Sequence, residues 1–470
     1  MKFNKIKSAL LALGVLALAG AAQAQTMIYV TGSTAARAGF YAAATTTGYI
    51  FTNANASTNV LYDPAGGGSA DSKIMYQGQM AGIGPVILNC SFTGSEAGIA
   101  AVAQKTLTQP LSYHASSADG NPNAASYPST TAYALPGTPN PTFYIAAGST
   151  ATATHVADLT MADTSQTVAQ TPISAAHLTD YGVIGVVPFT WMKGYTSVGN
   201  STWTNIVNIT PTTASGALTV GELYGAWNFT GVTNDIANDV TVAVVGRNLG
   251  SGTRADVFLN AGVGLFSPVL QYAWGNPTNL YPASAPGVLT FGTNNSTAYA
   301  AGQTLTCVYN DGFDGGGGVQ SSLNTDQSSL ISSAGIILLG YLGVSDAKHA
   351  LNNDNTGPGG SGAAPSSGAP TPLQWNGVYE SDTAVAFGTY TLWGEEHLLG
   401  PVSPTTAQAA AGTAISTGVK NYFNAQALAS GNIVSNHSQS YLIGVGTMQV
   451  HRGTLAGNGS DTGYPAQGGF

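Results

Sequence analysis

Four short segments of the chain combine glycine with hydroxyl side chains close to an apolar run. They span residues 29–36, 92–98, 246–254 and 315–322. Each segment is predicted to follow a strand and to form a tight turn before a helix. At the N-terminus of such a helix, backbone N–H groups have no intrahelical acceptor, and the helix dipole also favours an anion. Glycine lets the backbone approach a ligand, and Ser or Thr adds a hydroxyl donor. One such turn is an ordinary helix cap, but four in one chain predict a site for a small oxyanion.

The third segment carries the most specific feature. Arg247 comes directly after an apolar run at residues 240–245 and four residues before Ser251, in a chain with only four arginines. The planar guanidinium can hold an oxyanion through two parallel hydrogen bonds. The alternative is an arginine at the surface or one paired with a nearby carboxylate.

Residues 245–253 resemble the Arg-x-x-Gly-Ser-Gly-Thr motif of the phosphate-binding proteins of ABC phosphate uptake. Residues 31–35 resemble the Gly-rich first turn of that family, residues 94–99 its Gly-Ser-x-x-Gly turn, and residues 156–163 its strand that ends in a binding Asp. The resemblance covers most of residues 26–399 in order, at low identity. By position, it implies these ligand-binding residues: Thr34, Ala35, Ser95, Asp163, Arg247, Ser251, Gly252 and Thr253.

The resemblance also implies a function. We expect an exported protein that captures inorganic phosphate, or a similar protonated oxyanion, in a cleft between two lobes. It implies no catalysis and no cofactor, and it implies an ABC permease of the inner membrane as partner. Scattered histidines without metal-ligand spacing agree with this, as does a glycine run at residues 315–318 that lacks the Lys of a nucleotide-binding loop.

Asp163 carries the specificity argument. A carboxylate only accepts hydrogen bonds, and hydrogen phosphate has a proton to donate whereas sulfate at neutral pH has none. A buried Asp163 facing sulfate would be an unpaired repulsive charge, so it favours protonated oxyanions. Two alternatives stay open: Asp163 caps the turn at residues 164–165, or Asp119 takes the ligand role instead.

Two departures from the family pattern stand out. Family members commonly have an acidic residue that braces the arginine where this chain has Leu249. Glu96, next to Ser95, adds negative charge near the predicted site. Both imply weaker phosphate binding or a different anion.

Short β-like runs alternate with helical patterns, which predicts an α/β fold. Strands are expected at residues 27–31, 86–90, 183–187, 240–245 and 336–340. Helices are expected at residues 33–44, 95–107, 218–227, 254–261 and 319–333. The cluster Glu395, Glu396 and His397 is a weak candidate for a metal site, because the following leucines suggest a packed helix.

The implied fold is the two-lobed periplasmic-binding-protein-like (type 2) fold with long low-complexity insertions. One lobe is expected to combine residues 25–182 and 345–470, and the other to span residues 183–344. Residues 113–153 and 353–372 are rich in Pro, Gly, Ser and Ala, which is typical of long surface insertions.

The first residues indicate export. Lysines at positions 2, 5 and 7 precede an apolar run at residues 9–18 and a small-x-small sequence at residues 22–24. This pattern predicts a signal peptide over residues 1–24 and a periplasmic or extracellular protein. In that oxidising compartment Cys90 and Cys307 are a possible disulfide; two buried thiols are the alternative.

Charged residues are scarce, at 7% of the chain, and the formal net charge is -9. Twelve basic residues stand against 21 acidic ones, and three of the basic ones fall in the predicted signal peptide. Nucleic-acid binding is therefore excluded, because no basic stripe exists to meet phosphates. A weakly charged surface also associates readily, so self-association is expected to be possible. The rival function is a surface or structural protein that keeps this fold with weak or no ligand binding.

Overall fold

The computed structural model describes residues 26–52, 60–62, 73–104, 111–114, 152–164, 178–224, 239–265, 267–274, 296–299, 303–351, 368–428, 442–452 and 465–467. The predicted signal peptide, Asp119 and most of both predicted insertions lie outside the described residues. Within them, no helix has the length and apolarity needed to cross a bilayer.

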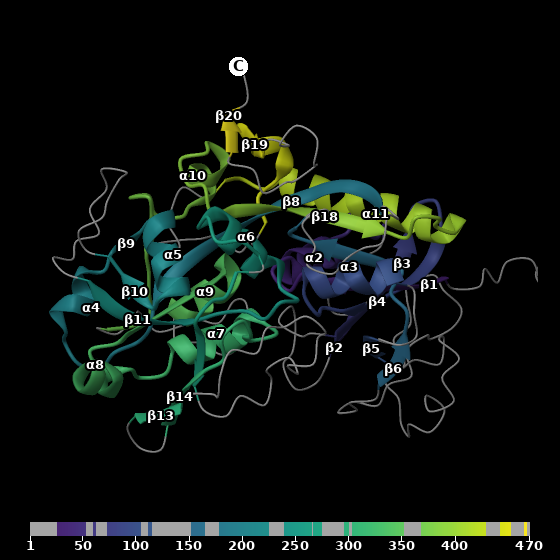
Figure 1. Cartoon of the computed structure of the whole chain (residues 1–470). Helices are drawn as coiled ribbons and strands as arrows, with labels where there is room; N and C mark the ends of the chain where they lie inside the picture. Colours follow the sequence, from purple (N-terminus) through teal and green to yellow (C-terminus); the bar gives the residue numbers. More distant parts are fainter. Residues whose placement is uncertain are drawn as a thin grey trace, which may run out of the picture.

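A large mixed sheet forms the centre of the molecule and has two flanks (Figure 1). The strands of the first flank are β1 (Thr26–Gly32), β2 (Val60–Tyr62), β3 (Lys73–Met80), β4 (Gly84–Ser91) and β7 (Leu159–Ala162). Those of the second are β10 (Glu222–Leu223), β11 (Val240–Val245), β12 (Gln271–Trp274), β13 (Ser296–Tyr299), β14 (Gln303–Cys307), β15 (Ile337–Gly343) and β16 (Thr371–Pro372). Between them lie β8 (Thr179–Lys193) and β18 (Trp393–Gly400).

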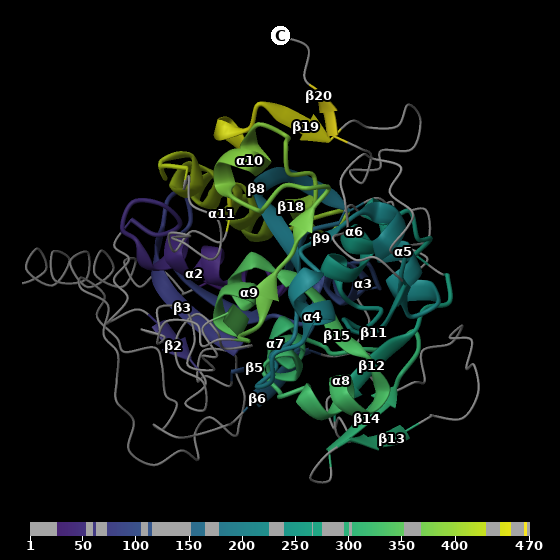
Figure 2. The same cartoon turned by 90° about the vertical axis from the view of Figure 1, so that its left-hand side faces the viewer.

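The strand order is β13-β14-β12-β11-β15-β8-β18-β7-β1-β4-β3-β2, with β10 on β11 and β16 on β8. Parallel pairs form within each flank, as between β1 and β4 or between β11 and β15. The long strand β8 joins the flanks, because its first part pairs with β18 and its last part, from Phe189 to Lys193, pairs with β15. Figure 2 shows β8 and β18 running together through the molecule.

Helices pack on the sheet, which confirms the α/β fold class. They are α2 (Arg37–Thr45), α3 (Ser95–Gln104), α4 (Ser201–Asn205), α5 (Pro211–Thr219), α6 (Gly252–Asn260), α7 (Gly316–Leu323), α8 (Ser328–Ala334), α9 (Val344–Leu351), α10 (Asp382–Ala386) and α11 (Thr406–Asn424). The helix α11 packs along β8, α3 packs on β1 and β7, and α6 contacts β15 and β18.

Smaller elements complete the described fold. They are a short 3-10 helix, η4 (Val445–Thr447), and three two-stranded sheets: β5 (Leu111–His114) with β6 (Thr152–His155), β9 (Asn208–Ile209) with β17 (Gln374–Trp375), and β19 (Val450–Arg452) with β20 (Pro465–Gln467).

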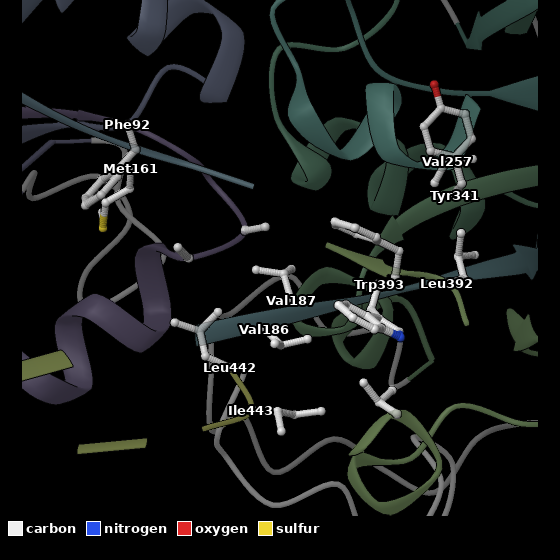
Figure 3. Close-up of a cluster of buried hydrophobic side chains, with 14 of the residues drawn as sticks. Phe92, Met161, Val186, Val187, Val257, Tyr341, Leu392, Trp393, Leu442 and Ile443 are labelled. Atoms are coloured by element: carbon white, nitrogen blue, oxygen red, sulfur yellow. The ribbon is translucent and has the colours of Figure 1, made fainter. Parts of the chain in front are cut away.

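One hydrophobic cluster runs through both flanks of the sheet. Figure 3 shows Val187 of β8 and Trp393 of β18 at its middle, with Phe92 on one side and Tyr341 of β15 on the other. All four side chains are buried. Because burying one large apolar side chain stabilises a fold by roughly 1.5–3 kcal/mol, this shared core holds the two flanks together.

Three helix predictions need correction. The helix expected at residues 218–227 is wrong: α5 begins earlier, at Pro211, where Thr210 and Thr213 form a capping box, and the chain turns into β10 after Gly221. The long helix expected at 319–333 is two helices, α7 and α8. Between them the Gln327 side chain donates to the Gly194 carbonyl and accepts from the Leu338 N–H, which fixes the break.

The segment of Glu395, Glu396 and His397 is not helical either. It lies in β18, paired with β8 over most of its length and with β7 near its end. The pairing satisfies its backbone from both sides, and tertiary pairing of this kind overrides a local helical pattern.

The possible disulfide between Cys90 and Cys307 is wrong. Both cysteines are buried and free, Cys90 in β4 and Cys307 in β14. Seven strands separate β14 from β4 in the sheet: β12, β11, β15, β8, β18, β7 and β1. A disulfide needs Cα atoms within about 7 Å, so the alternative of two buried thiols holds.

Candidate functional site

The first turn follows β1 and precedes α2. The Ser33 N–H donates to the Met161 carbonyl at 2.8 Å, and the Ser33 hydroxyl accepts from the Ala36 N–H at 3.2 Å. These bonds fix the turn and leave the N–H groups of Thr34 and Ala35 without an acceptor among the described residues. The turn thus presents two backbone donors and the Thr34 hydroxyl.

The second turn and the end of β7 bring Ser95 and Asp163 together. Ser95 is the first residue of α3, and its hydroxyl donates to Asp163 Oδ1 in a short hydrogen bond. The Asp163 N–H in turn donates to Ser95 Oγ at 3.3 Å. Asp163 is 2% exposed. Its carboxylate therefore belongs to the interior of the site.

The third turn supplies Ser251, Gly252 and Thr253 at the start of α6. Ser251 is the N-cap, and its hydroxyl oxygen accepts from the Arg254 N–H at 3.3 Å, which leaves its proton free to donate. Thr253 Oγ1 lies 3.4 Å from Asp163 Oδ2 and donates to it. The N–H groups of Gly252 and Thr253 have no intrahelical acceptor, because they open the helix.

Gly252 packs directly against Asp163. A Cβ at this position would lie 1.6 Å from Asp163 Oδ1, a distance that no side chain could adopt. Glycine at this position is therefore required for the N-terminus of α6 to reach the carboxylate. The sequence motif explains its presence, and the geometry gives the physical reason.

Arg247 is buried, at 2% exposure, and its side chain is held by two carbonyl groups. Its Nε donates to the Phe313 carbonyl at 3.2 Å, and its Nη2 donates to the Asp314 carbonyl at 2.8 Å and to Thr34 Oγ1 at 3.3 Å. Backbone carbonyls thus brace the guanidinium, and the residue at position 249 is a leucine, which offers it no charge.

The electrostatics of the site follow from burial. Burial raises the pKa of Asp163 above its ordinary value, while the Ser95 hydroxyl and the charge of Arg247 act to lower it. Burial also lowers the pKa of Arg247, and the charges of Asp346 and Asp163 oppose that change. An arginine remains charged in proteins, so the charged guanidinium of Arg247 and the carboxyl of Asp163 interact in a region shielded from water.

The two flanks of the sheet meet at these turns. Besides the contacts of Arg247 with Thr34 and of Thr253 with Asp163, the Glu96 N–H donates to the Gly250 carbonyl at 3.1 Å. Gly94 precedes α3 with a φ of 106°, and a Cβ there would lie 2.5 Å from the same carbonyl oxygen. A residue with a side chain would push the turns apart.

The structure therefore gathers the predicted residues at one place. A hydrogen bond links Thr34 to Arg247. Three other predicted residues contact Asp163: Ser95, Gly252 and Thr253. Ser251 caps α6, the helix that begins with Gly252. Ala35 neighbours Gly343 across the flanks.

The fourth Gly-rich segment does not join the predicted anion turns. A Cβ on Gly316, the first residue of α7, would lie 1.8 Å from Asp346 Oδ2, so a carboxylate of the chain itself occupies that helix end. The segment contributes differently, through the carbonyls of Phe313 and Asp314 just before it. Among the described residues, no group of three His, Cys, Asp or Glu side chains could hold a metal ion.

Sequence reasoning missed the residues that support Arg247 from behind. The Tyr341 hydroxyl accepts from the Arg247 N–H at 3.1 Å and donates to Gln271 Oε1 at 2.6 Å. The Gln271 amide then donates to the Arg247 carbonyl at 3.2 Å. These partners come from β15 and β12, and no local pattern marks them.

Comparison with known proteins gives likeness in structure alone. No family model matches the sequence, and no curated protein matches it. A proposed phosphate ABC transporter substrate-binding protein from Clostridium perfringens, solved with bound phosphate, is 13% identical, with a TM-score of 0.40 over 89% of this chain and 100% of that one. An ABC-type phosphate transport receptor from Vibrio cholerae is 11% identical, with a TM-score of 0.35 over 83% and 93%. PstS from Borrelia burgdorferi is 10% identical, with a TM-score of 0.32 over 86% and 98%.

Proposed function

We propose that this chain is an exported binding protein that captures inorganic phosphate, or a similar protonated oxyanion, between two lobes and without catalysis. In this proposal, residues 25–182 and 345–470 form most of one lobe and residues 183–344 most of the other, with β16 crossing to pair with β8 in the second flank, and the lobes close around the ligand by a hinge motion. An inner-membrane ABC permease is the partner that the sequence motifs imply. The argument rests on the chemistry of the site, taken in three steps.

The first step is the supply of donors. Backbone N–H groups of Thr34, Ala35, Gly252 and Thr253 lack acceptors among the described residues. They belong to turns joined by the hydrogen bond from Arg247 to Thr34 and by the contact of Thr253 with Asp163. Backbone donors at helix N-termini with one guanidinium are the chemistry that holds a small oxyanion.

The second step is the carboxyl of Asp163, the observation that carries the proposal. It is buried beside Gly252, and the positive charge of Arg247 acts to lower its pKa. An anion bound against a buried carboxylate is stable only if one of the two brings a proton to the contact. Hydrogen phosphate and hydrogen arsenate bring one, and sulfate does not.

The third step is the absence of a reacting group. The hydroxyls of Ser95 and Thr253 both donate to Asp163, and no histidine contacts either hydroxyl within the described residues. A nucleophilic hydroxyl needs a base that is itself oriented by a third group. Because both hydroxyls are engaged with Asp163, we propose that they orient that carboxyl toward the anion.

Calorimetric titration of the purified protein with phosphate, arsenate and sulfate tests the proposal. We expect binding heat with phosphate and arsenate, at least about tenfold weaker binding of sulfate, and loss of phosphate binding in Arg247→Ala. Lys73→Gln, in β3, removes one cation that makes none of these hydrogen bonds, and it should bind as the wild type does. No heat with any of the three anions, together with concentration-dependent assembly, would instead favour the surface or structural protein.

A further inference from the structure

A second carboxyl, that of Glu396, lies behind Asp163. In the antiparallel pair of β18 with β7, His397 faces Ala162 and Leu398 faces Met161. One step further along the same register, Glu396 falls opposite Asp163. Directly opposed residues in an antiparallel pair point to the same face of the sheet. Glu396 has no exposed surface.

The surroundings of Glu396 offer little to stabilise a negative charge. No hydrogen bond of ordinary geometry reaches either carboxyl oxygen among the described residues. Burial is the main cause that raises the pKa of Glu396 well above its ordinary value, and the charges of Asp163 and of Asp256 in α6 add to it. The nearby Ser33 hydroxyl and the neighbouring His397 act in the opposite direction.

Asp163 and Glu396 differ in what favours their ionised forms. Asp163 accepts from the hydroxyls of Ser95 and Thr253 and lies near the charge of Arg247. Glu396 has only Ser33 and His397 to oppose two neighbouring carboxyls and complete burial. When two interacting carboxyl groups are shielded from water, ionisation of both costs much more free energy than ionisation of one. The proton that the pair retains therefore belongs on Glu396.

We propose that Glu396 is a neutral carboxylic acid at physiological pH, which leaves Asp163 as the carboxylate that faces the oxyanion site. With Glu396 neutral, one negative charge fewer opposes Arg247, and the backbone donors can hold the anion. With Glu396 ionised, the pocket would carry one more negative charge, which would repel the anion. The effect on the ligand rests on the proposed function, whereas the protonation of Glu396 does not.

The protonation is tested without any ligand. A carboxyl that keeps its proton in the folded state and loses it in the unfolded state destabilises the fold as pH rises above its ordinary pKa of 4.5. From pH 5 to pH 7, the folding equilibrium constant of the wild type should therefore fall, relative to that of Glu396→Gln, by about tenfold per pH unit. Denaturant unfolding at each pH measures both.

The matched control is Glu395→Gln, the partly exposed neighbour in β18, whose stability should follow that of the wild type with pH. Parallel curves for the wild type and Glu396→Gln would overturn the proposal, because they mean that Glu396 is ionised in the folded protein. If Glu396→Gln fails to fold, Glu396→Met provides the same comparison, since it also has no proton to lose.

The ligand arm uses inorganic phosphate at pH 7.5. Replacing a neutral acid by a neutral amide should leave the affinity of Glu396→Gln within about threefold of the wild type. A tightening of tenfold or more would show that a negative charge has been removed, and a loss of tenfold or more would show that the amide cannot replace an ionised carboxylate; either overturns the proposal. If the wild type binds no phosphate, the proposed function fails, and the unfolding curves still decide the state of Glu396.

Discussion

The guanidinium of Arg247 donates to the hydroxyl of Thr34 across 3.3 Å, although 213 positions separate the two residues in the chain. Thr34 belongs to the turn after β1 and Arg247 to the turn after β11, so this bond crosses from one flank of the sheet to the other. An anion that takes hydrogen bonds from both would strengthen the same connection. Under the proposed function, anion binding would therefore be coupled to the contact between the two flanks.

Replacing Arg247 by lysine should separate charge from geometry. Lysine keeps the positive charge but loses the planar fork that reaches the carbonyls of Phe313 and Asp314. We expect phosphate affinity to fall by about tenfold to a few hundredfold, since hydrogen bonds to charged groups contribute roughly 1.5–3 kcal/mol each. Calorimetry measures the loss. Unchanged affinity would mean that Arg247 acts through its charge alone.

Asp163→Asn should change which anion binds. The amide can donate a hydrogen bond where the carboxylate only accepts, so sulfate no longer meets an unpaired negative charge. We expect sulfate affinity to rise and the preference for phosphate over sulfate to shrink by about tenfold or more. Parallel titrations with both anions at one pH give the ratio. An unchanged ratio would remove Asp163 from the specificity argument.

Gly252→Ala tests the close packing of α6 on Asp163. The added Cβ must displace the carboxylate or the helix, because it would lie 1.6 Å from Oδ1. Overpacking of this kind costs about 1–3 kcal/mol of stability, and phosphate binding should weaken with it. Gly317→Ala in α7 is the matched control, since nothing lies within 4 Å of its Cβ. There alanine should leave stability unchanged or raise it by about 0.5–1 kcal/mol.

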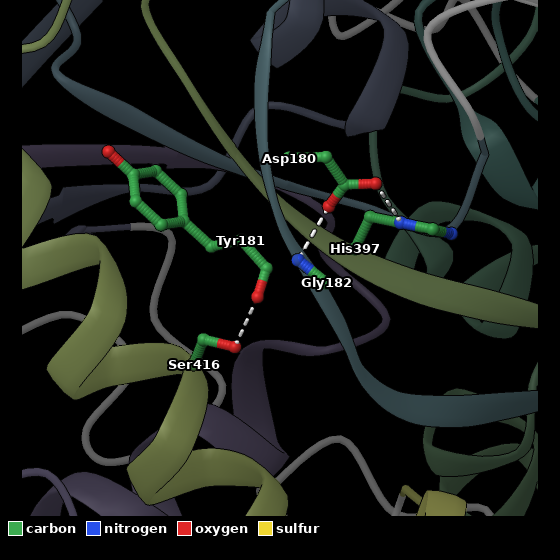
Figure 4. A network of polar contacts seen from close by, with 5 residues as sticks. All are labelled: Asp180, Tyr181, Gly182, His397 and Ser416. Carbon is green, nitrogen blue, oxygen red and sulfur yellow. Dashed lines mark hydrogen bonds and ion pairs between the residues drawn. The ribbon is translucent and has the colours of Figure 1, made fainter.

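The contact between His397 and Asp180 gives a prediction for acid conditions (Figure 4). His397 Nδ1 lies 3.0 Å from Asp180 Oδ2, and Gly182 N–H donates to the same carboxylate at 2.6 Å. Burial acts to raise the pKa of Asp180, but the hydrogen bond and charge of His397 outweigh it and leave that pKa below the ordinary 3.8.

A lowered carboxyl pKa stabilises the fold above pH 3.8 and ceases to do so as the pH falls through the lowered value. Asp180→Asn should therefore be slightly less stable than the wild type at pH 6, by less than about 1 kcal/mol because the carboxylate is partly exposed. The two proteins should converge in strong acid. Denaturant unfolding at pH 6, 4 and 3 follows the difference, and a constant gap over this range would contradict the assignment.

Local turns were easier to predict from the sequence than the elements around them. Turns such as those at Thr34 and Ser251 have strong local chemistry, since glycine and hydroxyl residues between a strand and a helix have few other uses. The strand at residues 240–245 was predicted with the bounds that β11 has, because a mostly apolar run stands directly before a turn.

The remaining features depend on contacts between distant segments. The segment of Glu396 seemed helical, yet it pairs as a strand with β7 and β8. The Arg247 guanidinium donates to the backbone carbonyls of Phe313 and Asp314. Every residue has a backbone carbonyl, so the sequence cannot indicate which ones accept these hydrogen bonds. A disulfide between Cys90 and Cys307 was considered only because the predicted compartment is oxidising. The order of the strands that separate the two cysteines in the sheet excludes it.

The strand β8 pairs with β18 over its first part and with β15 of the second flank over its last part, and β18 in turn pairs with β7 of the first flank. Unfolding of either flank would break hydrogen bonds of β8 or β18, the two strands that connect the flanks. Both flanks also contribute side chains to the same hydrophobic cluster. The chain should consequently melt as one cooperative unit, with equal calorimetric and van't Hoff enthalpies. A scan with two separated heat-absorption peaks would show instead that each flank is an autonomous folding unit.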